Sequence, residues 1–165
     1  MQKSSKFFTL RRRSGQALES VTEGYRDLLA VRLRNRNVLA VYGFGSFFRG
    51  TATRHSDIDF GILFAPGRRG PTTLQIRRVR DVLTEVFGQE RVDLVMLNTA
   101  APLIRYEAVT CGRLLYVRRG FHASLYETRV LKEYEDTRHL RLSAGERMLR
   151  RIALGTFGQP AVERL

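Results

Sequence analysis

The stretch from Gly45 to Phe64 reads GSFFRGTATRHSDIDFGILF, and it contains the feature that decides the fold. Asp57 and Asp59 stand one residue apart at the head of an apolar run that is typical of an interior strand. Because successive strand side chains alternate between faces, both carboxylates are expected on the same face. An isolated buried charge is costly unless it is paired or coordinates a cation. The pattern therefore predicts a positive partner, such as a divalent ion, beside these two residues.

A third aspartate interrupts another hydrophobic run. Residues 92–97 read VDLVML, in which Asp93 is the one polar residue. If the two strands are neighbours, Asp57, Asp59 and Asp93 converge on one spot. Carboxylate oxygens suit Mg²⁺ or Mn²⁺, ions that in proteins also bind substrate phosphates. Two such ions, about 3.5–4 Å apart, stabilise the attacking and leaving oxygens of a phosphoryl displacement. The alternative is structural: Asp57 caps the turn after Ser56, and Asp93 pairs with an arginine.

A glycine–serine pair, Gly45-Ser46, precedes the aspartates by about eleven residues. It follows the apolar run 38–44, which predicts a short buried strand. A glycine at a strand end followed by a helix start presents backbone N–H donors to an anion, and Ser46 adds a hydroxyl. Arg49 is a candidate for neutralising phosphate charge, with a solvated surface role as the alternative. The pair is therefore a candidate phosphate-binding turn.

Helices and buried strands alternate along the chain, which predicts an α/β domain, either in three layers or as a mixed sheet with helices on one face. Thr72 and Gln75 have the spacing of a capping box, and Thr99 is a candidate cap for the helix that contains Pro102. The predicted strands are 38–44, 57–64, 92–97 and 113–117, and the predicted helices are 16–34, a short one from Ser46 to about 50–54, one after Thr72, 101–111, 122–140 and 143–154.

Composition favours one soluble domain. The 165 residues suit a single core, and no apolar run approaches the ~20 residues of a membrane helix. Cys111 is the only cysteine and no signal-peptide pattern is present, so a cytoplasmic location is expected. The net charge of +13 has three interpretations: a nucleic-acid surface, affinity for a nucleotide or an acidic protein, or a solvated basic face. The arginines are spread along the chain, which does not favour one nucleic-acid patch.

The run from Gly45-Ser46 through Arg49-Gly50-Thr51-Ala52 to Ser56-Asp57-Ile58-Asp59 resembles the signature of the DNA-polymerase-β-type nucleotidyltransferase superfamily. More narrowly, it is similar to the minimal nucleotidyltransferase (MNT) group, whose antitoxin members pair with HEPN-type toxins. The similarity extends to residues 92–95, 101–107 and 112–116 and covers about residues 36–137.

This resemblance implies a polymerase-β-like fold, a small mixed β-sheet flanked by α-helices, here with C-terminal helices. It implies transfer of AMP from ATP to an acceptor hydroxyl, in the antitoxins a tyrosine of the HEPN ribonuclease toxin. Asp57, Asp59 and Asp93 then match the catalytic and metal-binding carboxylates, which hold two Mg²⁺ ions, and Gly45, Ser46 and Arg49 match the nucleotide-binding turn. Phe48 departs from the pattern, because a small residue is common there, and crowding of the turn is expected.

Three domain segments are expected: a basic arm over 1–13, a nucleotidyltransferase core over 14–120 and a helical extension of the same domain over 121–165. Three other functions compete with the protein adenylyltransferase. One is a small-molecule, antibiotic-type nucleotidyltransferase, whose polycationic substrate a +13 protein disfavours. Another is a noncatalytic antitoxin that neutralises its toxin by binding. The last is a basic nucleic-acid-binding module.

Overall fold

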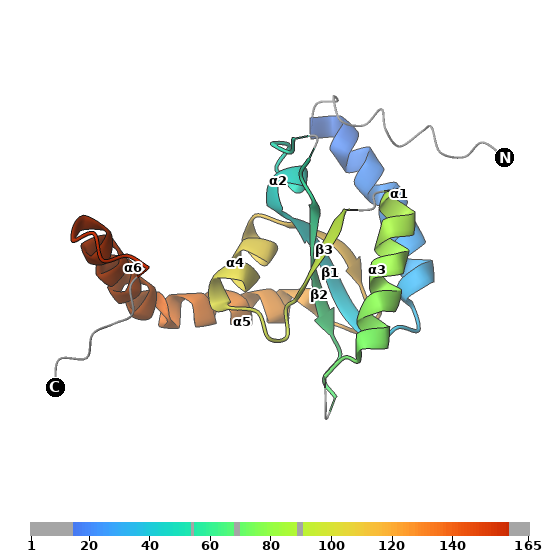
Figure 1. Ribbon diagram of the computed structural model, residues 1–165. Coiled ribbons are helices and arrows are strands. Elements are labelled where there is room, and N and C mark those ends of the chain that lie inside the picture. Colours follow the sequence, from blue (N-terminus) through green and yellow to red (C-terminus); the bar gives the residue numbers. More distant parts are fainter. Residues whose placement is uncertain (1–14, 54, 68–69, 89–90, 159–165) are drawn as a thin grey trace.

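A four-stranded mixed sheet forms the centre of the molecule (Figure 1). The computed structural model describes residues 15–53, 55–67, 70–88 and 91–158, with side chains from residue 24 onward. The strand order is β3-β2-β1-β4, in which β1 is antiparallel to β2 and β4, and β2 is parallel to β3. The strands are β1 (Val38–Phe44), β2 (Ile58–Phe64), β3 (Val92–Met96) and β4 (Arg113–Val117).

Helices α1 (Gly15–Leu33) and α3 (Thr73–Phe87) cover one face of the sheet. Tyr25 of α1 packs on Phe87 of α3 with ring centroids 4.3 Å apart, so the two helices also contact each other. The layer between helices and sheet is apolar, which removes these side chains from water and stabilises the fold. Its fully buried members include Leu29, Leu33, Val38, Val41, Phe60, Val79 and Leu83.

Helices α4 (Pro102–Thr110) and α5 (Ala123–Asp136) cover the opposite face. Their buried residues Ala108, Tyr126 and Val130 pack with Ala40 and Tyr42 of β1. The fold therefore has three layers, the first of the two arrangements expected from the sequence. The short helix α2 (Gly45–Phe48) follows β1, and α6 (Arg138–Ala153) extends away from the sheet (Figure 1). No helix in the described part of the chain is long and apolar enough to cross a bilayer.

Some of the local features predicted from the sequence are confirmed by the structure, and others are wrong. The Thr72–Gln75 capping box is confirmed, with both reciprocal hydrogen bonds present, and two of the four strands have their predicted bounds. The predicted Thr99 cap is wrong: Ala101 precedes α4 without a side-chain cap, and the Thr99 N–H instead donates to Met96 O in a turn. Pro102 explains the difference, because it begins the helix and needs no hydrogen-bond acceptor for an N–H.

The boundary between the two C-terminal helices also differs from prediction. The expected helices were 122–140 and 143–154, whereas α5 ends at Asp136 and α6 begins at Arg138. Thr137 marks the break, where its hydroxyl donates to Glu133 O at 2.8 Å. A threonine side chain that bonds to the preceding turn competes with helix continuation and bends helices. The predicted arm over 1–13 lies outside the described residues.

Candidate active site

Strand register brings two of the three aspartates side by side. Asp59 is the second residue of β2, and it lies opposite Asp93 of the parallel neighbour β3. The two strands are therefore neighbours, which is the condition under which the sequence predicted convergence of the aspartates. Asp57 immediately precedes β2, so the strand begins one residue later than predicted. The flanking residues Ile58 and Val92 pack toward α1 and α3, which directs the carboxylates to the other face.

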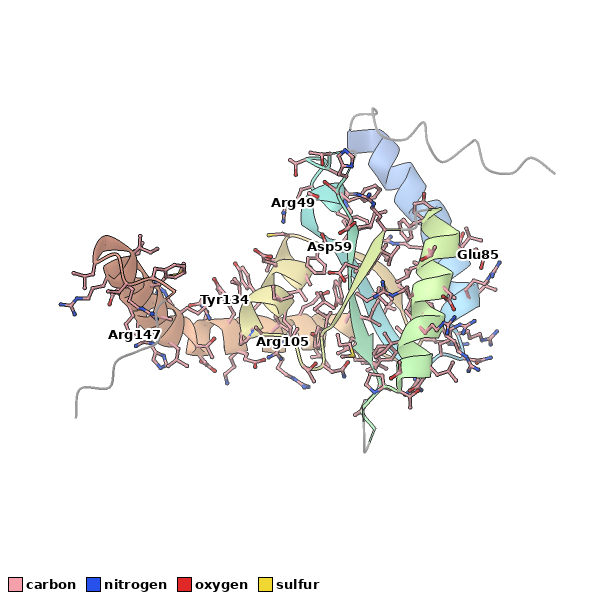
Figure 2. All side chains as sticks on the ribbon, viewed as in Figure 1. Arg49, Asp59, Glu85, Arg105, Tyr134 and Arg147 are labelled. Carbon is pink, nitrogen blue, oxygen red and sulfur yellow. The ribbon has the colours of Figure 1, made fainter. Side chains whose placement is uncertain are left out.

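Electrostatic coupling joins the three carboxylates. Asp59 is half-buried, and its pKa is raised, first by burial and then by the negative charges of Asp93 and Asp57. The cation of Arg49 acts in the opposite direction and lowers this pKa. Figure 2 shows Arg49 and Asp59 near each other at the α2 end of the sheet. The charged residues that shift the pKa of Asp59 are thus all candidate site residues predicted from the sequence.

The turn after β1 lies directly against Asp59. Gly45 has a φ of 74°, in the left-handed region that favours glycine. A Cβ at this position would overlap Asp59 Oδ2. The glycine is therefore required twice, for its backbone conformation and for the approach of the carboxylate. Ser46, the next residue, is half-buried at the start of α2.

Phe48 does not crowd this turn, so that expectation is wrong. Its side chain is 7% exposed and packs against Phe60 and Phe87, with ring centroids 5.8 and 6.3 Å away. A Cβ on Gly43 would overlap the Phe48 ring. The absence of a side chain at Gly43 therefore makes room for a large ring beneath the turn, where it joins the core instead of the site.

The chemistry of the donor set suits a hard cation. Ionised carboxylates are pure acceptors, and the mutual repulsion of three of them is relieved by a divalent ion. Among the described residues, no group of three or more aspartate, glutamate, histidine or cysteine side chains is positioned to hold a metal ion unaided. Magnesium sites in nucleotide enzymes commonly use one or two carboxylates and complete their coordination with phosphate oxygens and water. The residues present fit that open type of site.

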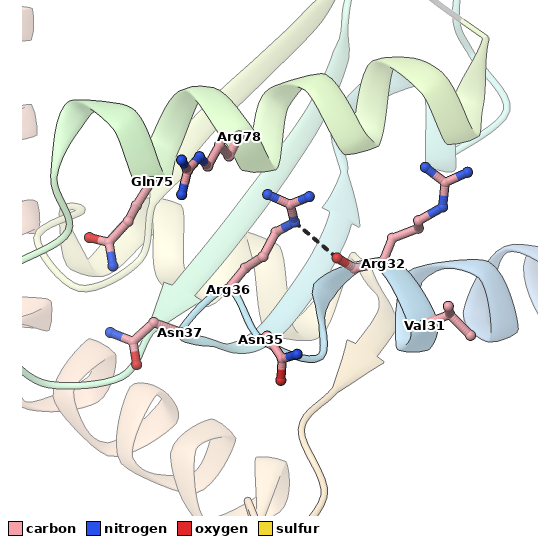
Figure 3. Close-up of a pocket in the computed structure, with 7 residues that line it drawn as sticks. All are labelled: Val31, Arg32, Asn35, Arg36, Asn37, Gln75 and Arg78. Atoms are coloured by element: carbon pink, nitrogen blue, oxygen red, sulfur yellow. Dashed lines mark hydrogen bonds between the residues drawn. The ribbon is translucent and has the colours of Figure 1, made fainter.

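A cavity of about 360 Å³ lies elsewhere, at the opposite end of β2 (Figure 3). Arginines dominate its charged lining, but two of them have structural contacts. Arg36 Nε donates to the Arg32 carbonyl at the end of α1 at 2.9 Å, and Arg32 forms an ion pair with Glu85 of α3 at 2.8 Å. The cavity is lined by Val31, Arg32, Asn35, Arg36, Asn37, Gln75 and Arg78 and contains none of the site residues.

Comparison with known proteins places this geometry in a family. The family described as "Polymerase beta, Nucleotidyltransferase" matches residues 28–120, more than half of the chain. The matched segment contains Gly45, Ser46 and all three aspartates of the candidate site. None of the curated proteins compared with the chain matches it.

Solved structures of similar fold include toxin–antitoxin complexes. A complex with AMP-PNP aligns with a TM-score of 0.60 and 23% identity, covering 75% of this chain and 98% of that one. A variant MntA–HpeT complex gives a TM-score of 0.61 and 21% identity, covering 78% and 98%. A tri-AMPylated HEPN toxin with MNT antitoxin from Shewanella oneidensis gives a TM-score of 0.57 and 19% identity, covering 78% and 98%. At these identities the likeness establishes the fold.

Proposed function

The chain belongs to the polymerase β nucleotidyltransferase family, and from this we propose that it is an MNT-type antitoxin that transfers AMP from ATP to a tyrosine hydroxyl of a HEPN-type toxin. The pairing of Asp59 with Asp93 across two parallel strands, beside Gly45, carries the proposal of catalysis. The partner is suggested by the solved complexes of similar fold, which include an MNT antitoxin with an AMPylated HEPN toxin and a complex with AMP-PNP.

Each site residue has a role in this proposal. Asp57 and Asp59 would hold one Mg²⁺ ion, and Asp93 would help to hold a second one. When bound, magnesium would neutralise negative charge on the phosphate oxygens. The Gly45-Ser46 turn binds the triphosphate through backbone N–H groups and the serine hydroxyl. Arg49, whose cation already acts on Asp59, neutralises phosphate charge.

The reaction is a displacement at the α-phosphorus of ATP. The toxin's hydroxyl oxygen forms a bond to this phosphorus, the bond between the α-phosphorus and the bridging oxygen breaks, and pyrophosphate leaves. Asp93 accepts the proton of the hydroxyl. Its Oδ1 accepts a hydrogen bond from Leu94 N at 2.9 Å, which orients the carboxylate. The protein mainly positions the reactants and balances their charge.

Mass spectrometry of the toxin tests the proposal. A HEPN-type protein, sought in the reading frames that flank this one, is incubated with the purified full chain, ATP and Mg²⁺, and its tyrosines are then mapped. We expect the toxin to gain mass in AMP-sized steps on tyrosine, and we expect EDTA to prevent the gain. Tight binding without a change in mass would replace the proposal with the noncatalytic antitoxin. AMP transfer to a small molecule alone would favour the antibiotic-type enzyme.

A further inference from the structure

Helix α6 is an uncovered helix on an otherwise packed molecule. None of its residues is buried, and it projects away from the three-layer core (Figure 1). An isolated helix of this length is marginally stable in water, and most helices in proteins are stabilised by an apolar face packed on another element. Seven large apolar side chains in and directly after α6 are between 49% and 69% exposed: Leu140, Leu142, Met148, Leu149, Ile152, Leu154 and Phe157.

Three of these apolar residues, together with Ala144, follow helical spacing, whereas Leu142 and Leu149 lie on another side of the helix. Leu140, Ala144, Met148 and Ile152 recur every four residues and therefore form one stripe along α6. We call these four residues the α6 stripe. Such a stripe is what a helix presents when it lies in the groove of a partner protein.

The start of α6 is held in place by contacts with α4 and α5. The Arg141 guanidinium lies 3.5 Å from the centroid of the Tyr134 ring, and that ring stacks on Tyr106 of α4 at 3.9 Å. An ion pair of 2.7 Å between Arg105 and Glu133 joins the same two helices. Because these contacts fix the junction, the helix is presented in a defined direction relative to the core.

The positive charge of α6 indicates which class of partner it binds. Helix α6 contains five arginines and a single acidic residue, Glu146. A second copy of this helix would bring like charges together, and the segment 1–13 of the same chain is also basic. A nucleic acid would attract the arginines but would not bury the apolar side chains of the α6 stripe. An acidic protein surface with an apolar groove satisfies both features.

We propose that α6 is a docking helix whose stripe binds an apolar groove on an acidic surface of the toxin partner. The identity of the partner rests on the proposed function, whereas the need for an acidic groove rests on α6 alone. Docking through α6 raises the occupancy of the toxin on the enzyme without touching the reacting atoms. Its loss is therefore expected to raise KM for the toxin and leave kcat unchanged.

Alanine variants of the full chain test the proposal. Met148→Ala/Ile152→Ala removes half of the stripe but keeps α6 helical, since alanine is the best helix former. The matched control is His139→Ala/Ser143→Ala, also two substitutions on α6 but at exposed polar positions. Affinity for the purified toxin is measured by calorimetry. We expect the stripe variant to weaken binding at least about 30-fold and the control to change it less than about 3-fold.

Other outcomes would overturn the docking proposal. Unchanged toxin affinity in the stripe variant would do so, as would the absence of a HEPN reading frame beside this chain. A dimer of the isolated protein that the stripe variant converts to a monomer would assign the stripe to self-association. Loss of RNA binding in the variant would assign it to nucleic acid. If the stripe variant transfers AMP with an unchanged KM for the toxin, docking is refuted but catalysis stands. If toxin binding depends on the stripe but no AMP is transferred, docking stands and catalysis is refuted.

Discussion

The two faces of strand β2 have opposite chemistry at the start of the strand, where the apolar Ile58 is followed by Asp59. One face consists of Ile58, Phe60, Ile62 and Phe64, each at most 2% exposed and packed toward α1 and α3. The other face begins at the half-buried Asp59, opposite Asp93 of β3. The strand therefore has core residues on both faces, since Leu63 packs in the second core, and the candidate site lies where one of these faces begins, at Asp59. Substitutions on the two faces should separate loss of folding from loss of activity.

The largest expected effect is on the carboxylate face. We expect Asp59→Asn to reduce AMP transfer by about 10⁴-fold, because the change removes one charge from a set of catalytic groups that act together. The melting temperature should not fall, since the substitution also removes repulsion from Asp57 and Asp93. Single-turnover transfer of labelled AMP checks the first result. Asp81→Asn, an exposed position on α3, is the matched control and should retain full activity.

The apolar face should show the reverse pattern. Phe60 is fully buried, and its ring centroid lies 4.8 Å from that of Phe87. We expect Phe60→Ala to lower the free energy of unfolding by about 3–5 kcal/mol, because it leaves a cavity in the core. Urea denaturation measures this loss, and Phe157→Ala, at a side chain that is 58% exposed, should stay within about 0.5 kcal/mol of the wild type. Equal losses in the two variants would refute the assigned core.

Alanine substitutions at Gly45 and Gly50 distinguish the effect of backbone strain from the effect of the contact with Asp59. Gly45 and Gly50 have φ values of 74° and 75°, but only Gly45 adjoins the carboxylate. Alanine at either position should cost about 1–2 kcal/mol of stability through left-handed strain. Gly45→Ala should also displace Asp59 and reduce transfer by about 10–100-fold. Kinetics at a temperature where both variants are folded make the comparison, and equal activity in the two would show that the Gly45 contact is immaterial.

The smallest effect concerns a tyrosine on α5. Burial raises the pKa of Tyr126 to about 12, and its hydroxyl is buried without a hydrogen-bond partner in the described structure. A raised pKa means that the stability from the neutral phenol is complete below pH 10 and is lost as the pH rises through 12. Tyr126→Phe should therefore match the wild type within about 1 kcal/mol at pH 7 and lose less stability between pH 10 and 12. Thermal unfolding across this pH range gives the result, and parallel pH profiles would contradict it.

Sequence patterns predicted those parts of the fold that depend on near neighbours. The strand bounds 38–44 and 113–117 and the Thr72–Gln75 capping box follow from side chains a few residues apart, and all are confirmed. The place of Phe48 was mispredicted because its pocket depends on Gly43 and Phe87, which come from other elements. The break at Thr137 was mispredicted because residues 135–139, which read EDTRH, contain no glycine or proline to mark the end of a helix.

The candidate site was predictable as a list of residues but not as a geometry. The motif at Gly45-Ser46 and Asp57-Ile58-Asp59 identified the turn and two carboxylates, and Asp93 stood out as a charge in an apolar run. Periodicity does not fix strand order, so only the β2–β3 register brings Asp93 opposite Asp59. The roles of these residues, and the domain boundaries at 14–120 and 121–165, stay predictions.

The most direct test of the shared site is a double-mutant cycle between the two paired strands. Affinity for AMP-PNP with Mg²⁺ is measured by calorimetry for the wild type, Asp59→Asn, Asp93→Asn and the double variant. If the two carboxylates hold one magnesium–nucleotide complex, each single variant should bind AMP-PNP at least about 10-fold more weakly than the wild type. The double variant should then bind only slightly more weakly than the single variant with the lower affinity. Independent losses that multiply in the double variant, or no loss in Asp93→Asn, would contradict a common site.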